Sequence, residues 1–366
     1  RRSRSLPSSL FPLPSSLFPR RSPGTPPASP PATMPDDPAR DPWTHHMLRG
    51  DFEAAWVVSD RVLRERAGAP TWHLPRHLQS LWDGSPLTGR RVLVRCYHGL
   101  GDTIQFVRFL PRLRAQAAEV TLWAQPALLP LLRTARGVDR LLPLHDGTPQ
   151  VDHDADVEIM ELAHVFRVTP RGIPRRVPYL HAPPAPLVRD DGLHVGVVWQ
   201  SGGWNAERRT IPCRLLAPLA AIPDVTLHAL QRGPPLDDWP AAFGPVSGSD
   251  DVLAAAGVMR ALDLVLTVDS FPAHLAGALG VPVWTLLHAE CDWRWMATGR
   301  RSPWYPTMRL FRQPTPGAWE PVIAAVAAAL RRLARRRTAR EVATEPAARP
   351  AAQHAAPLPA GTAAAG

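Results

Sequence analysis

Short runs of apolar, often β-branched residues alternate with helical stretches from residue 91 onward. Four runs come first, at 91–96, 119–124, 138–142 and 155–160. After a proline-rich interruption at 181–191, five more follow, at 193–199, 225–230, 264–268, 281–287 and 308–311. Nearly continuous apolar strands that alternate with helices are typical of parallel sheets covered on both faces. Two such series predict an α/β protein of two doubly wound, Rossmann-like domains that face each other across a cleft. Ligands are expected beyond the carboxyl ends of the strands.

The flanking segments predict helices before and after these domains. An amphipathic helix is expected over 48–66, with Asp51 as its N-cap, and one face of it carries Phe52, Ala55, Trp56, Ser59 and Leu63. An alanine-rich helix is expected over 318–335. We therefore divide the chain into a leader (1–40), a helical lead-in (41–88), a first domain (89–184), a second domain (192–335) and a tail (336–366).

Both ends of the chain are low in complexity. Residues 1–33 are rich in Pro and Ser, contain LPSSLFP twice, and precede Met34. Because proline interrupts any apolar core, this segment makes a poor signal peptide. Two explanations stay open, upstream sequence read through from a misplaced start and a disordered leader. The tail is rich in Arg, Ala and Pro, and we expect it to be disordered.

The composition excludes some chemistry. Lysine is absent and all 42 basic residues are arginine, so neither a Schiff-base lysine nor a P-loop lysine exists. The net charge is +10, but residues 1–40 contribute +4 and residues 331–366 contribute +5. Because the excess charge lies in the tails, we expect no specific nucleic-acid partner. Binding of nucleic acid by the tails is a minor alternative.

The cysteines and the hydropathy bear on location. Cys96, Cys213 and Cys291 are far apart and form no C-x-x-C pair, which favours a reducing compartment without disulfides or a zinc site. No stretch reaches about 18 uninterrupted apolar residues. We expect a cytoplasmic protein, with the cytoplasmic face of the inner membrane as one option, and we predict no metal site. The oligomeric state is not predicted.

A glycine-rich turn follows the first strand of the first domain. The sequence HGLGDT at 98–103 leads into a helix with apolar periodicity, and glycines at such a turn let a ligand approach the backbone. A dinucleotide site would need a third glycine, where Ile104 stands, and an acidic residue where the second strand ends at Gln125. NAD binding is therefore disfavoured. Asp102 is either the cap of its own helix or a general base that faces the cleft.

Three strand ends of the second domain are candidates for anion binding. Gln200 follows one strand, Gln231 follows the next, and Asp269-Ser270 precede a helix that starts near Pro272. Backbone N–H groups at a helix start, together with the Ser270 hydroxyl, form a phosphate cradle. Arg209 could add a charge-assisted contact. Plainer interpretations stay open: His274 as an ordinary partly buried histidine, and Arg208 and Arg209 as a solvated pair.

Aromatic residues cluster after the 281–287 strand, at Trp293, Trp295, Trp304 and Tyr305. We expect most of them to pack against the final helix. A rim on which a base or a sugar stacks is the alternative.

Five motifs occur in order along the chain: GLGDTIQF (99–106), RTIP (209–212), DSFPAHLAGALG (269–280), DWRW (292–295) and SPWYP (302–306). In combination they resemble glycosyltransferase family 9, the heptosyltransferase-like domains that often follow tetratricopeptide repeats in bacteria. The resemblance covers about residues 48–332. Segments 48–52 and 81–87 are similar to the short lead-in between such repeats and the catalytic domain.

The resemblance implies a GT-B fold and an inverting glycosyltransferase. The acceptor would lie mainly in the first domain, and the nucleoside-diphosphate sugar mainly in the second. The family's acidic residue after the glycine-rich turn falls on Asp102, the implied base. The acceptor and phosphate turn would comprise Gly99, Gly101, Thr103 and Gln105. The donor-binding residues would be Gln200, Arg208, Arg209, Gln231, Asp269, Ser270, His274 and Gly277.

The implied partners are a nucleotide sugar and a hydroxyl acceptor, which is a glycan, a lipid-linked glycan or a protein. No cofactor and no metal are expected. The pair Phe271-Pro272 is bulkier than the small pair typical of the donor loop. It motivates a second hypothesis, a non-catalytic module that keeps the fold and binds nucleotide sugars.

Overall fold

The structure is a computed structural model that describes residues 41–66, 82–203 and 205–344, with side chains up to residue 337. The expected leader and most of the expected tail lie outside the described residues. The first sheet has the order β3-β2-β1-β4 and is parallel throughout. Its strands are β1 (Arg91–Arg95), β2 (Glu119–Ala124), β3 (Arg140–Pro143) and β4 (Ala155–Glu158).

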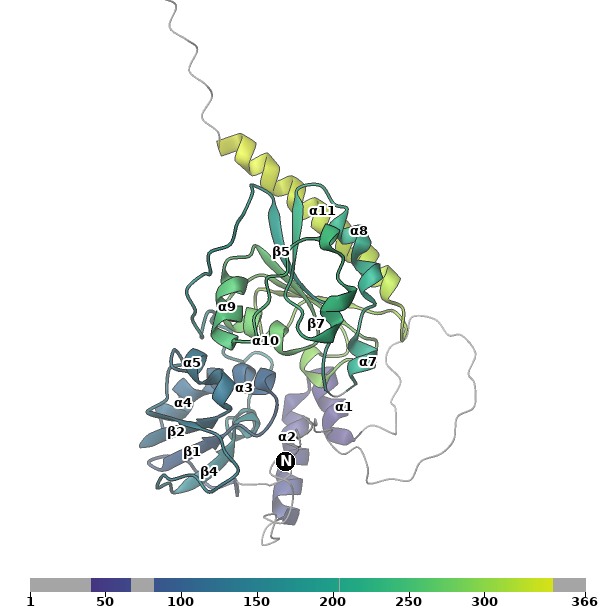
Figure 1. Cartoon of the computed structure of the whole chain (residues 1–366). Coiled ribbons are helices and arrows are strands. Elements are labelled where there is room, and N and C mark those ends of the chain that lie inside the picture. The colour runs from purple at the N-terminus through teal and green to yellow at the C-terminus, as the bar shows by residue number, and fades with distance from the viewer. Residues whose placement is uncertain (1–40, 67–81, 204, 345–366) are drawn as a thin grey trace, which may run out of the picture.

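The second sheet is also parallel and has the order β6-β5-β7-β8-β9. Its strands are β5 (Leu193–Val198), β6 (Val225–Ala229), β7 (Leu264–Val268), β8 (Val283–Leu287) and β9 (Met308–Arg312). The predicted strands agree with these bounds to within two residues. The predicted α/β class, a GT-B-like pair of Rossmann-like domains with a helical lead-in, is confirmed by this topology (Figure 1).

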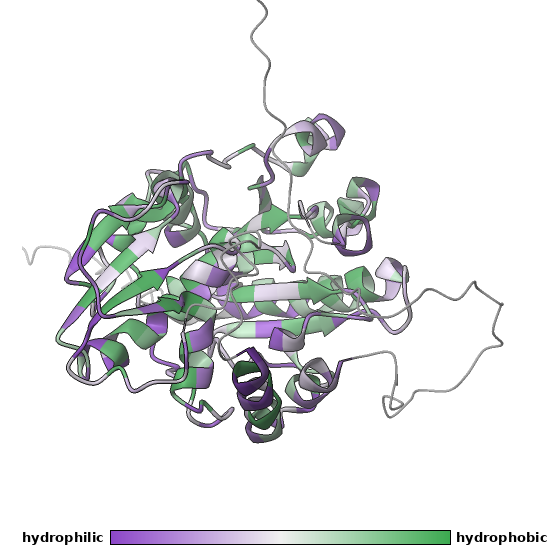
Figure 2. Ribbon diagram, turned by 90° about the horizontal axis from the view of Figure 1, so that it is seen from below, coloured by the Kyte–Doolittle hydropathy of each residue, from purple (hydrophilic) through white to green (hydrophobic). Residues whose placement is uncertain are grey.

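Helices follow the strands and cover the sheets. They are α3 (Leu100–Phe106), α4 (Leu110–Arg114), α5 (Leu129–Leu132), α6 (Leu162–Val165), α7 (Ala206–Arg209), α8 (Ala217–Ala220), α9 (Val252–Arg260), α10 (Phe271–Ala278) and α11 (Trp319–Thr344). Strands β5 and β7 are buried at every position, as parallel strands between two helical layers must be. Figure 2 shows this as green strands inside, with purple mainly on helix surfaces and loops.

The lead-in differs from the prediction of one helix over 48–66. Two helices occupy it, α1 (Pro42–Arg49) and α2 (Phe52–Arg66). Gly50 ends α1 with φ 78°, a left-handed conformation that favours glycine. Asp51 then caps α2, because its carboxylate accepts the Ala54 N–H at 3.2 Å. The predicted cap is therefore correct, while the predicted start of the helix was wrong.

The two domains meet without a break in the hydrophobic core. One buried cluster joins the first domain and the lead-in to the side of the second sheet covered by α9 and α10, whereas a separate cluster lies under α8 and α11. Helix α3 of the first domain packs against α10 of the second. Arg108 of the first domain also crosses the contact, donating to the Trp304 carbonyl at 2.5 Å. This contact positions the candidate site.

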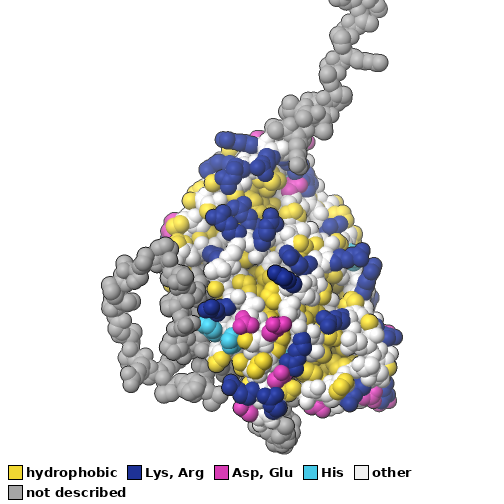
Figure 3. Space-filling view, turned by 180° about the vertical axis from the view of Figure 1, so that it is seen from behind, with side chains coloured by type: hydrophobic (Ala, Val, Ile, Leu, Met, Phe, Trp, Pro, Cys, Tyr) yellow, Lys and Arg dark blue, Asp and Glu magenta, His cyan; other side chains and the backbone are white. Residues whose placement is uncertain are grey.

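The last helix is longer than predicted, since α11 continues from residue 335 to Thr344 and so enters the expected disordered tail. The added residues are mostly Arg, Ala and Glu, which favour helix, and no proline occurs from residue 336 to residue 345. No helix among the described residues is long and apolar enough to cross a membrane. Figure 3 shows arginine side chains spread over the back of the molecule, with apolar surface between them.

Candidate active site between the two domains

The glycine-rich turn lies at the contact between the domains. Gly99 is the N-cap of α3, and Gly101 lies in its first turn. A Cβ on Gly101 would come within 2.8 Å of His274 Cδ2, on α10. The absence of a side chain at residue 101 therefore lets α3 and α10 approach closely. In this structure the glycine serves the contact between domains, whereas the sequence suggested an approach to a ligand.

Asp102 has partners in both domains. Its Oδ2 accepts the N–H of Gly99 at 2.9 Å, so Asp102 contributes to the cap of α3 from the third helical position, although the N-cap itself is Gly99. Its Oδ1 accepts a hydrogen bond from Arg294 Nη2 at 2.5 Å. The Asp102 side chain is still 24% exposed. The carboxylate therefore caps its helix and is also reachable from outside.

Arg294 is the residue that sequence reasoning missed. It lies in a short 3-10 helix, η8 (Trp293–Trp295), and donates to Asp102, to Gln105 Oε1 at 2.9 Å and to Asp292 Oδ1 at 2.9 Å. Burial alone would lower the pKa of Arg294, but Asp292 and Asp102 outweigh it and raise the pKa above its usual value. A guanidinium within an aromatic run needs buried anionic partners, and this was the available signal.

The predicted acceptor turn is otherwise internal. Thr103 and Gln105 are fully buried. Thr103 Oγ1 donates to Gln125 Oε1 at 3.0 Å, and Gln105 Oε1 accepts from Arg294. Both side chains fix the position of α3 through contacts within the protein.

On the second domain, Arg209 holds the turn between β7 and α10. It donates to the Asp269 carbonyl at 2.8 Å and to the Gly202 carbonyl at 3.1 Å. Burial, with a contribution from Asp292, raises the pKa of Asp269 to about 6. Ser270 Oγ donates to the Val268 carbonyl at 3.1 Å. The predicted donor turn is therefore close to Asp292, which pairs with Arg294.

His274 and Gly277 lie in the contact itself. His274 Nδ1 is 3.0 Å from the Tyr305 hydroxyl, and its ring stacks on Trp295. Burial and the nearby Arg294 lower the pKa of His274 well below its usual value. A Cβ on Gly277 would lie 2.4 Å from Tyr305 Cδ1. This geometry supports the plainer interpretation of His274, a buried packing residue, and gives Gly277 a packing role as well.

The remaining donor candidates separate into two groups. Gln231 is buried, and its Oε1 accepts the N–H groups of Trp199 and Gln200 at 3.1 and 2.9 Å. It thereby ties the ends of β5 and β6 together beside the donor turn. Arg208 instead pairs with Glu290 at 2.6 Å on the surface, with both side chains more than half exposed. Of the two arginines, Arg209 is thus the one built into the site.

Most of the aromatic cluster packs, as expected. Trp295, Trp304 and Tyr305 are fully buried. They pack beneath the contact between the domains, which differs from the predicted position against the final helix. Trp293 is only partly buried.

Comparison with known proteins finds one curated relative at low identity. No protein-family model matches the sequence. Protein FlbA of Caulobacter vibrioides is 29% identical over 299 residues, which cover 68% of this chain and 48% of FlbA. The chain therefore spans about half the length of this curated relative.

Several solved structures match this chain at low identity. The iron-containing dodecameric glycosyltransferase TibC from enterotoxigenic E. coli H10407 gives a TM-score of 0.48 at 13% identity, covering 70% of this chain and 78% of TibC. A glycosyl transferase of family 9 from Veillonella parvula gives 0.47 at 13% identity, covering 63% and 87%. E. coli heptosyltransferase WaaC with ADP-2-deoxy-2-fluoro heptose gives 0.45 at 13% identity, covering 67% and 100%. At this similarity no residue role is transferred to this chain.

Proposed function

We propose that this protein is an inverting glycosyltransferase that moves a sugar from a nucleoside-diphosphate sugar to a hydroxyl acceptor. One observation carries the proposal. A carboxylate at the start of α3, Asp102, is joined through the buried Arg294 and Asp292 to the donor turn of the other domain. The motif resemblance to glycosyltransferase family 9 supports the same reaction class.

In the proposed reaction Asp102 accepts the proton of the acceptor hydroxyl as its oxygen attacks the anomeric carbon. A carboxylate offers about four lone-pair directions, and Arg294 and the Gly99 N–H occupy two of them. The others are available to a hydroxyl. The start of α10 and the Arg209 guanidinium stabilise the negative charge that develops on the departing diphosphate. The only co-substrate that this scheme requires is the nucleotide sugar.

A second candidate is a module that binds nucleotide sugars without turnover. The specific observation in its favour is that both Asp102 oxygens already have partners. Calorimetry against a panel of nucleoside diphosphates and their sugars, run beside a transfer and hydrolysis assay, separates the two. Binding without hydrolysis or transfer would favour the module.

The decisive variant is Asp102→Asn. We expect transfer to fall by about 10²–10⁴, the usual contribution of a general base, while nucleotide binding in the calorimeter survives. The matched control is Asp251→Asn, because Asp251 caps α9 through the Ala254 N–H at 2.7 Å, and asparagine caps helices as well as aspartate. If Asp102→Asn turned over as fast as the control, Asp102 would have a capping role only and would not be the base.

A further inference from the structure

A cavity of about 570 Å³ lies between the lead-in helices and the first domain, apart from the donor turn. Helices α1 and α2 form one wall, and the end of β4 with the short 3-10 helix η4 (Ile159–Glu161) forms the opposite wall. Cavities of this size accommodate small organic ligands. None of the residues predicted for the donor lines it.

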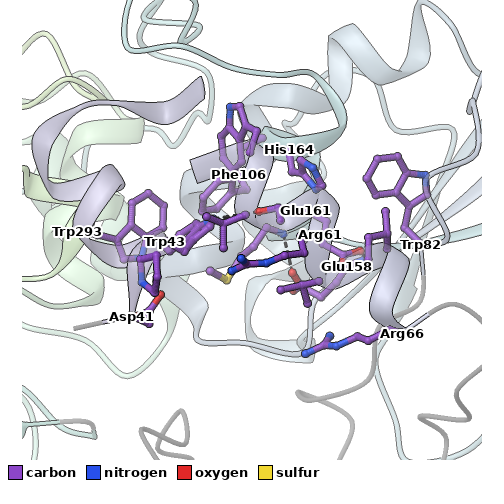
Figure 4. Close-up of a pocket in the computed structure, with 18 of the residues that line it drawn as sticks. Asp41, Trp43, Arg61, Arg66, Trp82, Phe106, Glu158, Glu161, His164 and Trp293 are labelled. Atoms are coloured by element: carbon purple, nitrogen blue, oxygen red, sulfur yellow. Dashed lines mark hydrogen bonds between the residues drawn. The ribbon is translucent and has the colours of Figure 1, made fainter. Parts of the chain in front are cut away.

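Aromatic rings supply much of the apolar lining: Trp43, Trp56, Trp82, Phe106 and Trp293. The indole N–H groups of Trp43, Trp56 and Trp82 donate to Ser59, to the Val168 carbonyl and to the Ser85 carbonyl. Trp56 and Trp82 are nearly buried and their rings already contact His164, so the free aromatic surface comes mainly from the partly buried Trp43 and Trp293. In Figure 4, Trp43 and Trp293 lie on one side of the cavity and Trp82 on the other, with Glu158, Glu161 and Arg61 between them.

Glu158 supplies the observation that points to a polar ligand. It is 5% exposed, and its Oε2 accepts the Met160 N–H at 2.7 Å. Its Oε1 has no hydrogen-bond partner among the described residues, and the nearest cationic candidate, His98 Nε2, is 3.8 Å away. A buried polar atom left unpaired is costly, so a hydroxyl donor from a ligand would stabilise this oxygen.

The raised pKa values of the two wall carboxyls argue against a cationic ligand. Burial raises the pKa of Glu158 well above its usual value and that of Glu161 to about 7. A protonated carboxyl both donates and accepts hydrogen bonds, which suits hydroxyl groups better than a cation. The aromatic faces suit the C–H faces of a sugar ring.

The cavity also lies beside the proposed base. Met160 Sδ is 3.9 Å from Arg294 Nη2, the atom that donates to Asp102. The Arg294 guanidinium lies over the Trp293 ring at 4.6 Å. Two wall residues therefore contact the arginine that holds Asp102.

We propose that this cavity binds the acceptor, and that the acceptor is a carbohydrate of roughly one to two sugar rings. Glu158 Oε1 accepts one of its hydroxyls, and the tryptophan faces stack on its C–H faces. This inference rests on the proposed function, because only a transferase has an acceptor. Binding of the saccharide itself can be measured without turnover. The lead-in helices then form one wall of a substrate-binding site.

The test measures saccharide binding without any nucleotide sugar. The full chain is applied to an array of immobilised mono- to tetrasaccharides, and the strongest binder is titrated by calorimetry. We expect Glu158→Gln to bind within about threefold of wild type, because an amide keeps one donor and one acceptor. Glu158→Leu and Trp43→Leu should each weaken binding at least about tenfold. Glu53→Leu, an exposed change on α2 outside the cavity, is the matched control and should bind as wild type.

Three results would overturn the proposal: no saccharide bound at millimolar concentration, equal binding by all variants, or loss of binding in Glu158→Gln as complete as in Glu158→Leu. The last result would mean that a charge is recognised. Thermal unfolding checks that each variant is folded, and Trp43→Leu keeps the test valid if Glu158→Leu is not. Saccharide binding with these variant effects but without nucleotide binding would refute the proposed function alone. Transfer unaffected by Glu158→Leu would refute this inference alone.

Discussion

Two carboxyl groups at the same edge of the first sheet have opposite surroundings. Asp102 follows β1 and meets a guanidinium that the second domain supplies, Arg294. Glu158 ends β4, keeps one oxygen unpaired, and has a pKa raised well above its usual value by burial, with smaller contributions from Glu161 and Asp102. The contact between domains thus supplies Asp102 with a guanidinium partner, whereas the nearest cationic candidate for Glu158 is His98 at 3.8 Å.

This difference matters for chemistry at a shared edge. Two acids that are chemically alike take different roles when their environments diverge. Asp102 depends on the second domain for its partner, whereas Glu158 depends on the lead-in helices for its burial. Changes to the domain contact should therefore affect Asp102 first, and changes to the lead-in wall should affect Glu158 and Glu161.

The largest effect is expected from Arg294→Met. It leaves the carboxylates of Asp102 and Asp292 without their shared cation, and removing one partner of a buried ion pair typically costs about 3–5 kcal/mol. Urea unfolding measures the loss. Arg208→Met is the matched control, because its pair with Glu290 is exposed and worth at most about 1 kcal/mol. Equal losses in the two variants would contradict a structural role for the pairing of Arg294 with Asp102 and Asp292.

A smaller effect is expected from Gly101→Ala. The new Cβ would lie 2.8 Å from His274 Cδ2, and Tyr305 and Trp295 hold that ring in place. Overpacking of this kind costs about 1–3 kcal/mol.

Two further variants check this explanation. Gly202→Ala is the control, because among the described residues, its chain neighbours aside, no atom lies within 4 Å of a Cβ added there, and it should change the free energy of unfolding by less than about 0.5 kcal/mol. Adding His274→Ala to Gly101→Ala should cost less than the two single losses combined, since the clash is removed. If Gly101→Ala lowered the free energy of unfolding no more than Gly202→Ala does, the contact between α3 and α10 would accommodate a methyl group without strain.

The strands were predictable because parallel strands must be apolar on both faces, and their residues show it. The lead-in was harder. Helix α1 has the sequence PWTHHMLR, in which no apolar period stands out, and only Asp41 before Pro42 signals its start. The break at Gly50 was present in the sequence, but a helix with an internal glycine is a permitted alternative.

The site was predictable only where it depends on local sequence. The position of Asp102 follows from a strand, a turn and a helix that are adjacent in the chain. Its partner Arg294 is 192 positions away, and no local pattern reports such a contact. A glycine at this turn lets either a ligand or a second helix approach the backbone. The sequence does not distinguish the two, and Gly101 was therefore interpreted as part of a ligand site. Glu158 was hidden inside a predicted strand over 155–160, although a carboxylate in that apolar run was itself a signal.

The last prediction tests the cavity wall through the pH dependence of stability. Burial raises the pKa of Glu161 to about 7 in the folded protein, against 4.5 for the ordinary carboxyl. The folded state therefore binds more protons between these values, so the stability of the wild type falls as the pH rises from about 4.5 to 7. Glu161→Gln removes that loss and should raise the free energy of unfolding by on the order of 2 kcal/mol at pH 8, with no gain at pH 4. Urea unfolding at both values measures the difference, and Glu65→Gln, exposed on α2, should change little at either. A gain that is the same at pH 4 and pH 8 would show that ionisation of Glu161 is not its cause.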